Sequence, residues 1–91
     1  MKYVLRLYVT GQTSQSAQTL NNIKKACEDE LKGEYDLKII DILKEPQRAL
    51  EDNVIATPTL VKKLPPPLRK LIGHLSETDH VLSGLNLKKA S

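Results

Sequence analysis

The sequence predicts an α/β fold, and three consecutive segments of its first half carry that prediction. In residues 2–10 every second side chain is large and apolar, which is typical of a strand with one apolar face. Residues 15–32 carry apolar side chains at spacings of three and four, which is typical of a helix with one buried side. Residues 35–42 form a second strand-like run. A strand, a long helix and a second strand predict a βαβ unit with parallel strands and a right-handed crossover.

The first strand and the helix have clear internal signals. One face of the strand is expected to hold Tyr3, Leu5, Leu7 and Val9. The apolar stripe of the helix consists of Ala17, Leu20, Ile23, Cys27 and Leu31. Thr13 or Ser14 is expected to cap the helix start without a full capping box, and Gly33 stands where a left-handed C-terminal cap belongs.

The second strand is expected to have structure on both of its faces. Its buried side chains are then Leu37, Ile39, Ile40 and Ile42. After this strand, Pro46 suits the first turn of a short helix that carries Ala49 and Leu50.

Residues after Ile42 fit two interpretations. Residues 54–61 resemble a strand except at Pro58, which has no N–H to donate and belongs at a sheet edge or beside an irregular bond. Residues 68–75 have helical apolar spacing, yet they also alternate as a short strand ending at Gly73. Residues 76–87 begin with a capping-box pattern, but they too could line one face of a strand. Propensity does not decide between helix and strand in either segment.

Composition limits the possible functions. The 91 residues suit one domain covering 1–91, with a thin aliphatic core that self-association or a partner would help to stabilise. The net charge of +3 comes from 14 basic and 11 acidic residues, and the chain has no Phe or Trp to stack on bases, so no nucleic-acid partner is expected. A single cysteine indicates a reducing, cytoplasmic setting. No apolar run approaches the ~20 residues of a membrane span, so we expect no stable membrane anchor.

No pattern typical of catalysis is present in the sequence. It lacks a Ser-His-Asp set, paired carboxylates and a glycine-rich phosphate loop. His74 and His80 have no cysteine or acid at ligand spacing, so a metal site is not expected. We therefore predict a protein that is not an enzyme and that has no cofactor.

The second half of the chain resembles the C-terminal half of thioredoxin. The resemblance rests on residues 56–60 (Ala-Thr-Pro-Thr-Leu), a hairpin-length interval, and residues 71–76 (Leu-Ile-Gly-His-Leu-Ser) before a capped helix. It implies a cis bond before Pro58 and a turn from strand to helix at Gly73. Thioredoxin chemistry needs Cys-x-x-Cys after the first strand, but residues 11–16 contain no cysteine, so dithiol chemistry is impossible. Cys27 is expected to be a buried structural thiol.

Nearly the whole chain is similar to the KaiB family, which has a thioredoxin-like sequence without the redox cysteines. The segments that carry this resemblance are 3–9 (YVLRLYV), 19–23 (TLNNI), 37–41 (LKIID), 56–60 (ATPTL), 64–67 (LPPP) and 82–87 (LSGLNL). The resemblance implies a metamorphic protein that interconverts between a self-associating KaiB ground state, dimer or tetramer, and a thioredoxin-like monomer that binds a KaiC-type ATPase. The two interpretations of the second half agree with that implication, since fold switching requires two packings of similar free energy.

The KaiB resemblance also implies particular functional residues. Partner-binding positions are Arg6, Lys38, Asn53, Arg69 and Lys70. Structural positions for the fold switch are Pro58, Pro65, Pro66, Pro67, Gly73, Gly84 and Asn86. KaiA-like proteins and histidine kinases are further possible partners.

The chain departs from the usual KaiB pattern at three places. His74 and Asn86 stand where the family commonly has Asp, and residues 88–91 (Lys-Lys-Ala-Ser) stand in place of an acidic tail. A stress-response output without a circadian oscillator is therefore an alternative expectation, as is a thioredoxin-fold binding module with another partner. A peroxidase or glutathione-dependent transferase on this fold is not expected, because no nucleophile follows the first strand.

Overall fold

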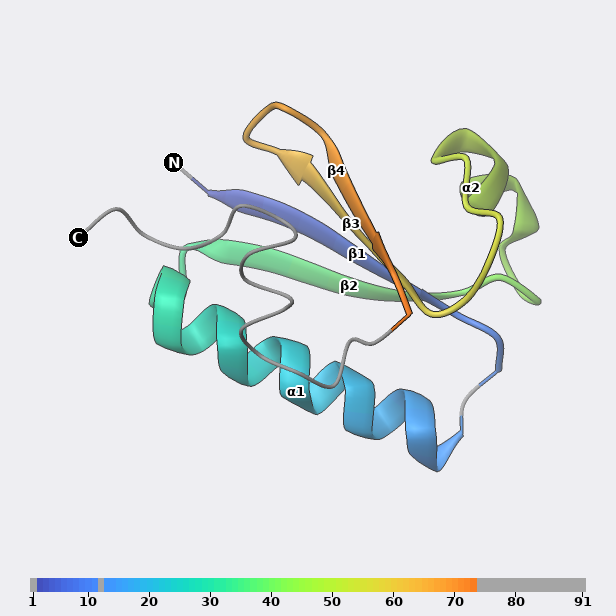
Figure 1. Ribbon diagram of the computed structural model, residues 1–91, viewed down its shortest axis with the longest axis horizontal. Coiled ribbons are helices and arrows are strands. Elements are labelled where there is room, and N and C mark those ends of the chain that lie inside the picture. Colours follow the sequence, from blue (N-terminus) through green and yellow to red (C-terminus); the bar gives the residue numbers. More distant parts are fainter. Residues whose placement is uncertain (1, 12, 74–91) are drawn as a thin grey trace.

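The computed structural model describes residues 2–11 and 13–73. In chain order the elements are β1 (Tyr3–Val9), α1 (Ser14–Leu31), β2 (Tyr35–Asp41), α2 (Pro46–Glu51), β3 (Thr59–Leu64) and β4 (Arg69–Ile72). The four strands form one sheet in the order β2-β1-β3-β4, so the first strand lies inside the sheet (Figure 1). The predicted α/β class is confirmed.

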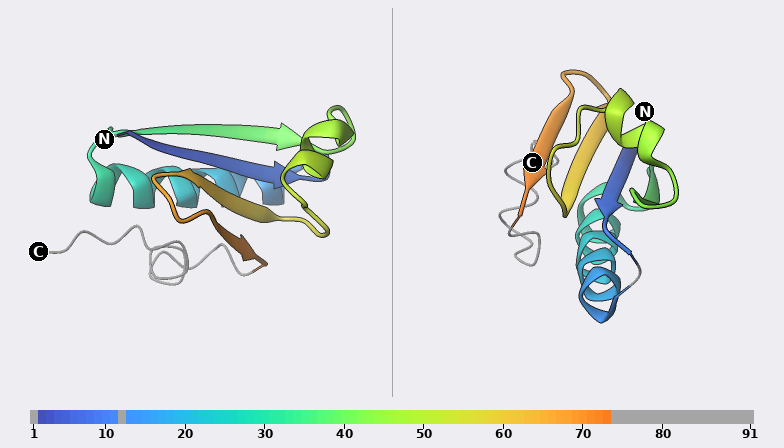
Figure 2. Two further views of the ribbon diagram at one scale, coloured as in Figure 1. Left: turned by 90° about the horizontal axis from the view of Figure 1, so that it is seen from above. Right: turned by 90° about the vertical axis from the view of Figure 1, so that its right-hand side faces the viewer.

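The βαβ unit predicted from the first half is present. β1 and β2 pair in parallel, with Tyr3 opposite Tyr35 and Val9 opposite Asp41. The crossover helix α1 runs along one face of the sheet, and α2 lies near the carboxyl ends of β1 and β2 (Figure 2). β3 pairs antiparallel with both β1 and β4, which makes β2 and β4 the two edges among the described strands.

The larger hydrophobic core lies between the sheet and α1. Leu5, Leu7 and Val9 point from β1 toward this helix, as the alternation predicts, and Leu60 joins them from β3. The helix contributes the buried side chains of Ile23, Ala26, Cys27 and Leu31. Cys27 is fully buried, as predicted, and this burial raises the pKa of its thiol to about 12.

A smaller cluster lies on the opposite face of the sheet, under α2. It consists of Tyr8, Ile40, Ala49 and Val61, with Ile42 and Val54 packed partly against it. Ala49 is the buried residue of α2, whereas Leu50 is exposed.

The second strand is less buried than its sequence predicts. Ile40 is buried, but Ile39 is 39% exposed and Leu37 and Ile42 are only half-buried. The expectation that structure covers both faces of this strand is wrong for Ile39. β2 lies at the edge of the sheet formed by the described strands, so none of these strands shields its outer side.

Both ends of α1 are capped. Thr13 is the N-cap: its Oγ1 accepts a hydrogen bond from the Ser16 N–H at 3.1 Å, and its own N–H donates to Ser16 Oγ at 2.9 Å. The structure thus has the full capping box that the sequence analysis did not expect, because serine at the third helical position replaces the usual Glu or Gln. Lys32 and Gly33 end the helix with left-handed φ values of 49° and 83°.

The ambiguous segment before Gly73 adopts the strand alternative. Residues 69–72 pair with β3 from Thr59 opposite Ile72 to Lys62 opposite Arg69. β3 itself begins one residue after Pro58, as expected for a residue without a backbone donor. The second ambiguous segment, residues 76–87, lies outside the described residues.

Candidate partner-binding face

Three of the predicted partner-binding residues lie in one row across the sheet. Arg6 on β1 is opposite Lys38 on β2 and opposite Val61 on β3, and Val61 is opposite Lys70 on β4. Side chains at paired positions point to the same face of a sheet. Arg6, Lys38 and Lys70 therefore share the face on which α2 packs, which we call the α2 face.

A buried carboxylate, Asp52, connects the end of α2 to this row. Its side chain is only 4% exposed, and its Oδ1 accepts a hydrogen bond from Lys63 Nζ at 2.8 Å. Arg6 Nη1 lies 3.8 Å from Asp52 Oδ2, and the Tyr8 hydroxyl donates to the same oxygen. Residues from β1, β3 and the α2 terminus are thus held together by one carboxylate.

The pKa values in this network follow from burial and pairing. Burial opposes ionisation of Asp52, but hydrogen bonds from Lys63 and Tyr8 and the charges of Lys63 and Arg6 outweigh it, so the pKa of Asp52 is lowered. Burial and the hydrogen bond to Asp52 raise the pKa of Tyr8 to about 12. At neutral pH, Asp52 is therefore a carboxylate and Tyr8 a neutral donor.

The strands of the α2 face carry more cations than carboxylates. Lys63, two residues after Val61, adds a fourth cation to Arg6, Lys38 and Lys70. Asp52 pairs with only two of the four. The Nε atom of Arg6 is buried and has no hydrogen-bond partner among the described residues. The four cations outnumber the carboxylates Asp36 and Asp52, so this face of the sheet has a net positive charge that an acidic partner surface would complement.

Asn53 belongs to this site, whereas Arg69 does not. The Asn53 carbonyl accepts a hydrogen bond from Lys70 Nζ at 3.3 Å, and its backbone has a left-handed φ of 54°. Arg69 pairs with Lys62 and so points to the opposite face of the sheet, since adjacent residues of a strand alternate. Burial and the charge of Arg69 lower the pKa of Lys62 there. The structure thus brings four of the five predicted residues together on one side of the sheet.

Sequence reasoning did not identify Asp52 or Lys63 as site residues. Tyr8 and Asp52 are 44 positions apart, and no local pattern connects them. Lys63 is two residues after Val61 and therefore points to the same face of the sheet. This inference requires knowing that residues 59–64 form a strand.

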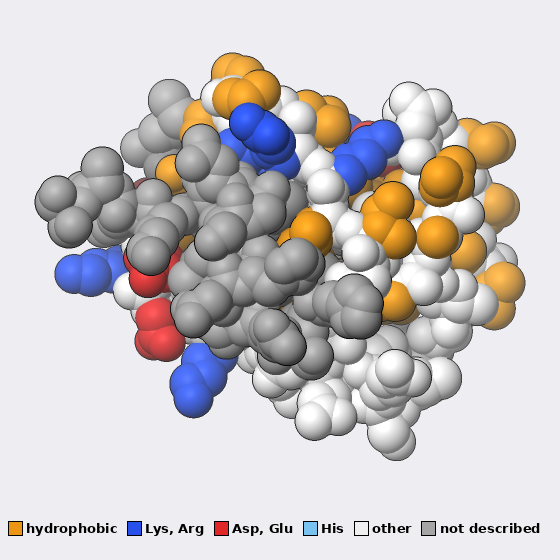
Figure 3. All heavy atoms as spheres, viewed as in Figure 1, with side chains coloured by type: hydrophobic (Ala, Val, Ile, Leu, Met, Phe, Trp, Pro, Cys, Tyr) orange, Lys and Arg blue, Asp and Glu red, His pale blue; other side chains and the backbone are white. Residues whose placement is uncertain are grey.

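Exposed apolar side chains flank the α2 face. Leu43 before α2, Leu50 within it and Ile55 after it are 69%, 78% and 88% exposed. Hydrophobic side chains are visible over the α2 end of the molecule in Figure 3. Such a patch beside charged residues is typical of a protein-binding surface.

The positions predicted to support a fold switch lie at connections between elements. The Thr57–Pro58 bond is cis, as the thioredoxin resemblance implies, and the Pro58 carbonyl accepts a hydrogen bond from the Gly73 N–H at 3.1 Å. Gly73 has a φ of 71°, which explains a glycine there. Pro65, Pro66 and Pro67 form the turn between β3 and β4, with cis bonds before Pro65 and Pro67. Gly84 and Asn86 lie outside the described residues, as do His74 and His80.

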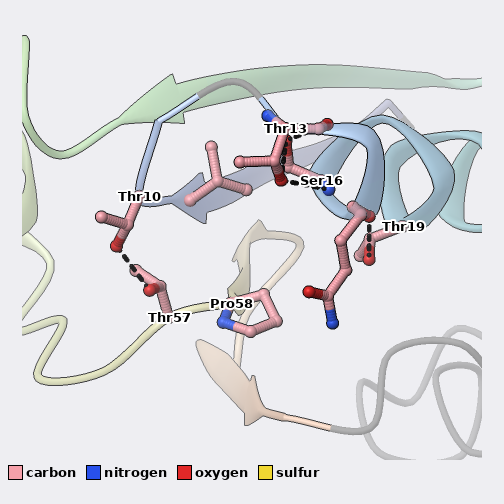
Figure 4. A pocket seen from close by; sticks show the side chains of 8 residues that line it. Thr10, Thr13, Ser16, Thr19, Thr57 and Pro58 are labelled. Carbon is pink, nitrogen blue, oxygen red and sulfur yellow. Dashed lines mark hydrogen bonds between the residues drawn. The ribbon is translucent and has the colours of Figure 1, made fainter.

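The end of β1, the start of α1 and Pro58 surround a pocket at the place where a thioredoxin has its dithiol. Thr13 and Ser16 stand at the helix start, and no cysteine lines the pocket (Figure 4). The described residues contain no cluster of three potential metal ligands. They also contain no helix that is both long and apolar enough to span a bilayer.

These features define a thioredoxin-like protein that lacks the thioredoxin dithiol. Among solved structures, the chain resembles the N-terminal domain of Synechococcus elongatus SasA, with a TM-score of 0.67 and 26% identity over 91% of this chain and 78% of that one. The Trx4 domain of ERdj5 matches with a TM-score of 0.61 and 9% identity over 90% and 75%, which supports the fold alone. The KaiB domain matches residues 6–87, and the chain belongs to the KaiB family.

Curated relatives agree with the family assignment. The circadian clock oscillator protein KaiB of Rippkaea orientalis is 58% identical over 93% of this chain and 82% of its own length. KaiB of Prochlorococcus marinus (strain MED4) is 55% identical over 93% and 79%, and the circadian clock protein KaiB3 of Synechocystis is 48% identical over 94% and 84%. KaiB is a family of non-enzymatic clock proteins, so this chain is a homologue of a clock protein and not an enzyme.

Proposed function

We propose that this chain binds a KaiC-type ATPase ring and modulates its ATPase or phosphorylation cycle. The observation that carries the proposal is the composition of the α2 face. Three cations lie in one row across the sheet and a fourth lies beside it, next to exposed apolar side chains on and around α2. Cations provide long-range attraction and specificity, and exposed apolar groups provide burial energy on contact. In this proposal the chain is a single cytoplasmic domain that alters the activity of its partner by binding to it.

The predicted binding residues have different parts in this proposal. Arg6, Lys38 and Lys70 attract acidic groups of the ring, and Asn53 holds the loop after α2 against Lys70. Leu50 and Ile55 supply the apolar contact. Arg69 lies on the other face and would act in a different interaction, such as self-association.

We further propose that the chain switches between this thioredoxin-like fold and a second, self-associating packing of its second half, as a dimer or tetramer. The sequence after Ile42 supports helix and strand about equally, whereas the βαβ unit has one interpretation. Pro58, Pro65, Pro66, Pro67 and Gly73 mark the connections at which the two packings would diverge. A ring that binds only the thioredoxin-like state would increase its population by mass action.

The test combines mass and structure on the full chain. Light scattering and NMR spectra would be recorded before and after adding a purified KaiC-type ATPase ring. The proposal predicts an oligomer, or a mixture of two states, that becomes a ring-bound, thioredoxin-like protomer. Absence of a complex at micromolar concentrations would contradict KaiC binding. A single monomeric state with and without the ring would contradict fold switching. KaiA-like proteins and histidine kinases would be tested as partners in the same way. The phenotype of the host would distinguish a stress-response output from a circadian one.

A further inference from the structure

Lys62 on β3 is a buried cation that has no place in the α2 face. The residue is only 2% exposed. It lies opposite Leu5 of β1 and two residues after Leu60, so it belongs to the face of the sheet that α1 covers. Leu5 and Leu60 are both fully buried. An ammonium group among such neighbours loses hydration, and this loss opposes its charged form.

The cross-strand neighbour of Lys62 does not compensate for this loss, because it is a second cation. Arg69 of β4 is directly opposite Lys62, and like charges at opposed positions of a sheet repel each other (β3 and β4 in Figure 1). Among the described residues, no carboxylate forms a salt bridge with Lys62. Burial and the charge of Arg69 lower the pKa of Lys62. A lysine that is desolvated or beside another cation is an activated amine nucleophile, and Lys62 meets both conditions.

We propose that Lys62 is a site of reversible carbamylation by carbon dioxide. The lone pair of the neutral Nζ attacks the carbon of CO₂ and forms a C–N bond. One C=O π pair moves to its oxygen, and Nζ passes a proton to water or a buffer base, so the product is a carbamate anion. The step needs no oxidant or reductant, and it reverses when CO₂ is removed. It replaces a positive charge opposite Arg69 by a negative one, so that a repulsive pair becomes an attractive pair.

Carbon dioxide fits this lysine better than a larger electrophile does. It is small, uncharged and apolar, so a small local fluctuation is enough for it to reach a side chain with so little exposed surface. An aldehyde carried by a larger molecule would need an open cavity, and the pocket beside Pro58 does not include Lys62. An imine would also lack the carboxylate that a carbamate presents to the Arg69 guanidinium. The proposal does not depend on ring binding, because Lys62 and Arg69 point away from the α2 face.

The next residue, Lys63, provides a matched comparison within the same strand. Its side chain is 30% exposed, and its Nζ donates a hydrogen bond to Asp52 Oδ1 at 2.8 Å. The carboxylate stabilises the ammonium form, which has no lone pair for attack on CO₂. If exposure alone decided reactivity, Lys63 would react more than Lys62. If burial beside a cation decides it, Lys62 reacts more.

The test exposes the full chain to dissolved CO₂ at fixed pH and ionic strength. Carbamates would be trapped by alkylation with a trialkyloxonium salt and located by mass spectrometry of peptides. We expect at least about tenfold more trapped carbamate at Lys62 than at Lys63, whose ammonium form Asp52 holds. In denaturant the two lysines should be labelled equally, because burial and pairing are both lost. Equal labelling of the two lysines in the folded protein, or more at Lys63, would overturn the proposal.

A second readout, the ¹³C NMR spectrum under ¹³CO₂, does not require the trapping reagent to reach a buried group. The wild type should show a carbamate resonance that Lys62→Met lacks and the control Lys63→Met keeps. Methionine replaces the buried cation by an apolar chain of similar volume, so Lys62→Met should fold. Arg69→Gln is expected to lower the carbamate fraction about threefold and keeps the test decisive if Lys62→Met unfolds. No carbamate resonance in the wild type, an unchanged one in Lys62→Met, or equal fractions in the wild type and Arg69→Gln would contradict the proposal.

Discussion

The two faces of the sheet are built in different ways. The face under α1 is closed by buried side chains from β1, α1 and β3, several of them with no exposed surface, and partly buried side chains from β2 and β4 pack against them. The α2 face has a smaller apolar cluster, one buried carboxylate and a row of cations, with apolar side chains at its margin exposed. This difference indicates that the first face supplies most of the stability, whereas the second is free to carry charges and contacts for a partner.

A core substitution on the α1 side should have the largest effect on stability. Leu7 is fully buried, so Leu7→Ala is expected to lower the free energy of unfolding by about 2–5 kcal/mol through lost burial and a cavity. Chemical denaturation measures this loss. Leu50→Ala on α2 is the control, since Leu50 is 78% exposed, and should change stability by less than about 0.5 kcal/mol. Similar losses of unfolding free energy in the two variants would contradict the conclusion that the α1 side supplies most of the stability.

Removing the charge of Asp52 should have the next largest effect. Asp52→Asn keeps the shape but leaves Lys63 and Arg6 beside a neutral amide, so we expect a loss of about 1–2 kcal/mol at pH 7. The partial exposure of both cations keeps this below the cost for a fully buried pair. Asp36→Asn, on the same face, is the control, because Asp36 forms no salt bridge to a described residue. A neutral result for Asp52→Asn would show that the network does not hold α2.

The same network predicts a pH effect. The folded-state pKa of Asp52 is lowered, so its contribution is fully present above the unfolded value of about 3.9 and is lost as pH falls through the folded pKa. The stability difference between the wild type and Asp52→Asn should therefore shrink below about pH 4. Asp41 also has a lowered pKa, from hydrogen bonds donated by the Leu43 and Gly11 amides, but it is unchanged in both proteins and cancels in the difference. A constant difference down to low pH would contradict this account.

The smallest effect on stability is expected at Lys38. This residue is exposed on the edge strand β2, so Lys38→Ala should change the free energy of unfolding by no more than about 0.5 kcal/mol. Thermal and chemical denaturation would both measure it. A loss of several kcal/mol would mean that the cation row stabilises the fold, and the functional interpretation of the α2 face would weaken.

The sequence predicts the first half of the fold closely, because local periodicity determines it. The helix is expected at 15–32 and occupies Ser14–Leu31. The first strand of the βαβ unit is one residue shorter than expected at each end, and the second is one residue shorter at its C-terminal end. The strand at Arg69–Ile72 could not be chosen over a helix, since the choice depends on pairing with β3, a non-local contact. The exposure of Ile39 was also not predictable, because it depends on β2 being at the sheet edge.

The candidate site was predicted only in part. Arg6, Lys38, Asn53 and Lys70 follow from a family resemblance, and the strand register explains how they come together. Asp52 has no sequence signal, because a buried carboxylate looks like any surface acid until the tertiary contacts of Tyr8 and Lys63 are known.

The most direct test of this account is the affinity of a KaiC-type ATPase ring for the wild type and for Ile55→Asp, measured by calorimetry alongside each protein's unfolding midpoint. Ile55 is 88% exposed beside α2, so the account predicts at least about tenfold weaker binding with an unchanged midpoint, and unchanged binding for the control Gln18→Asp on α1. Equal affinity of the wild type and Ile55→Asp would contradict the assignment of the α2 face as the partner-binding surface.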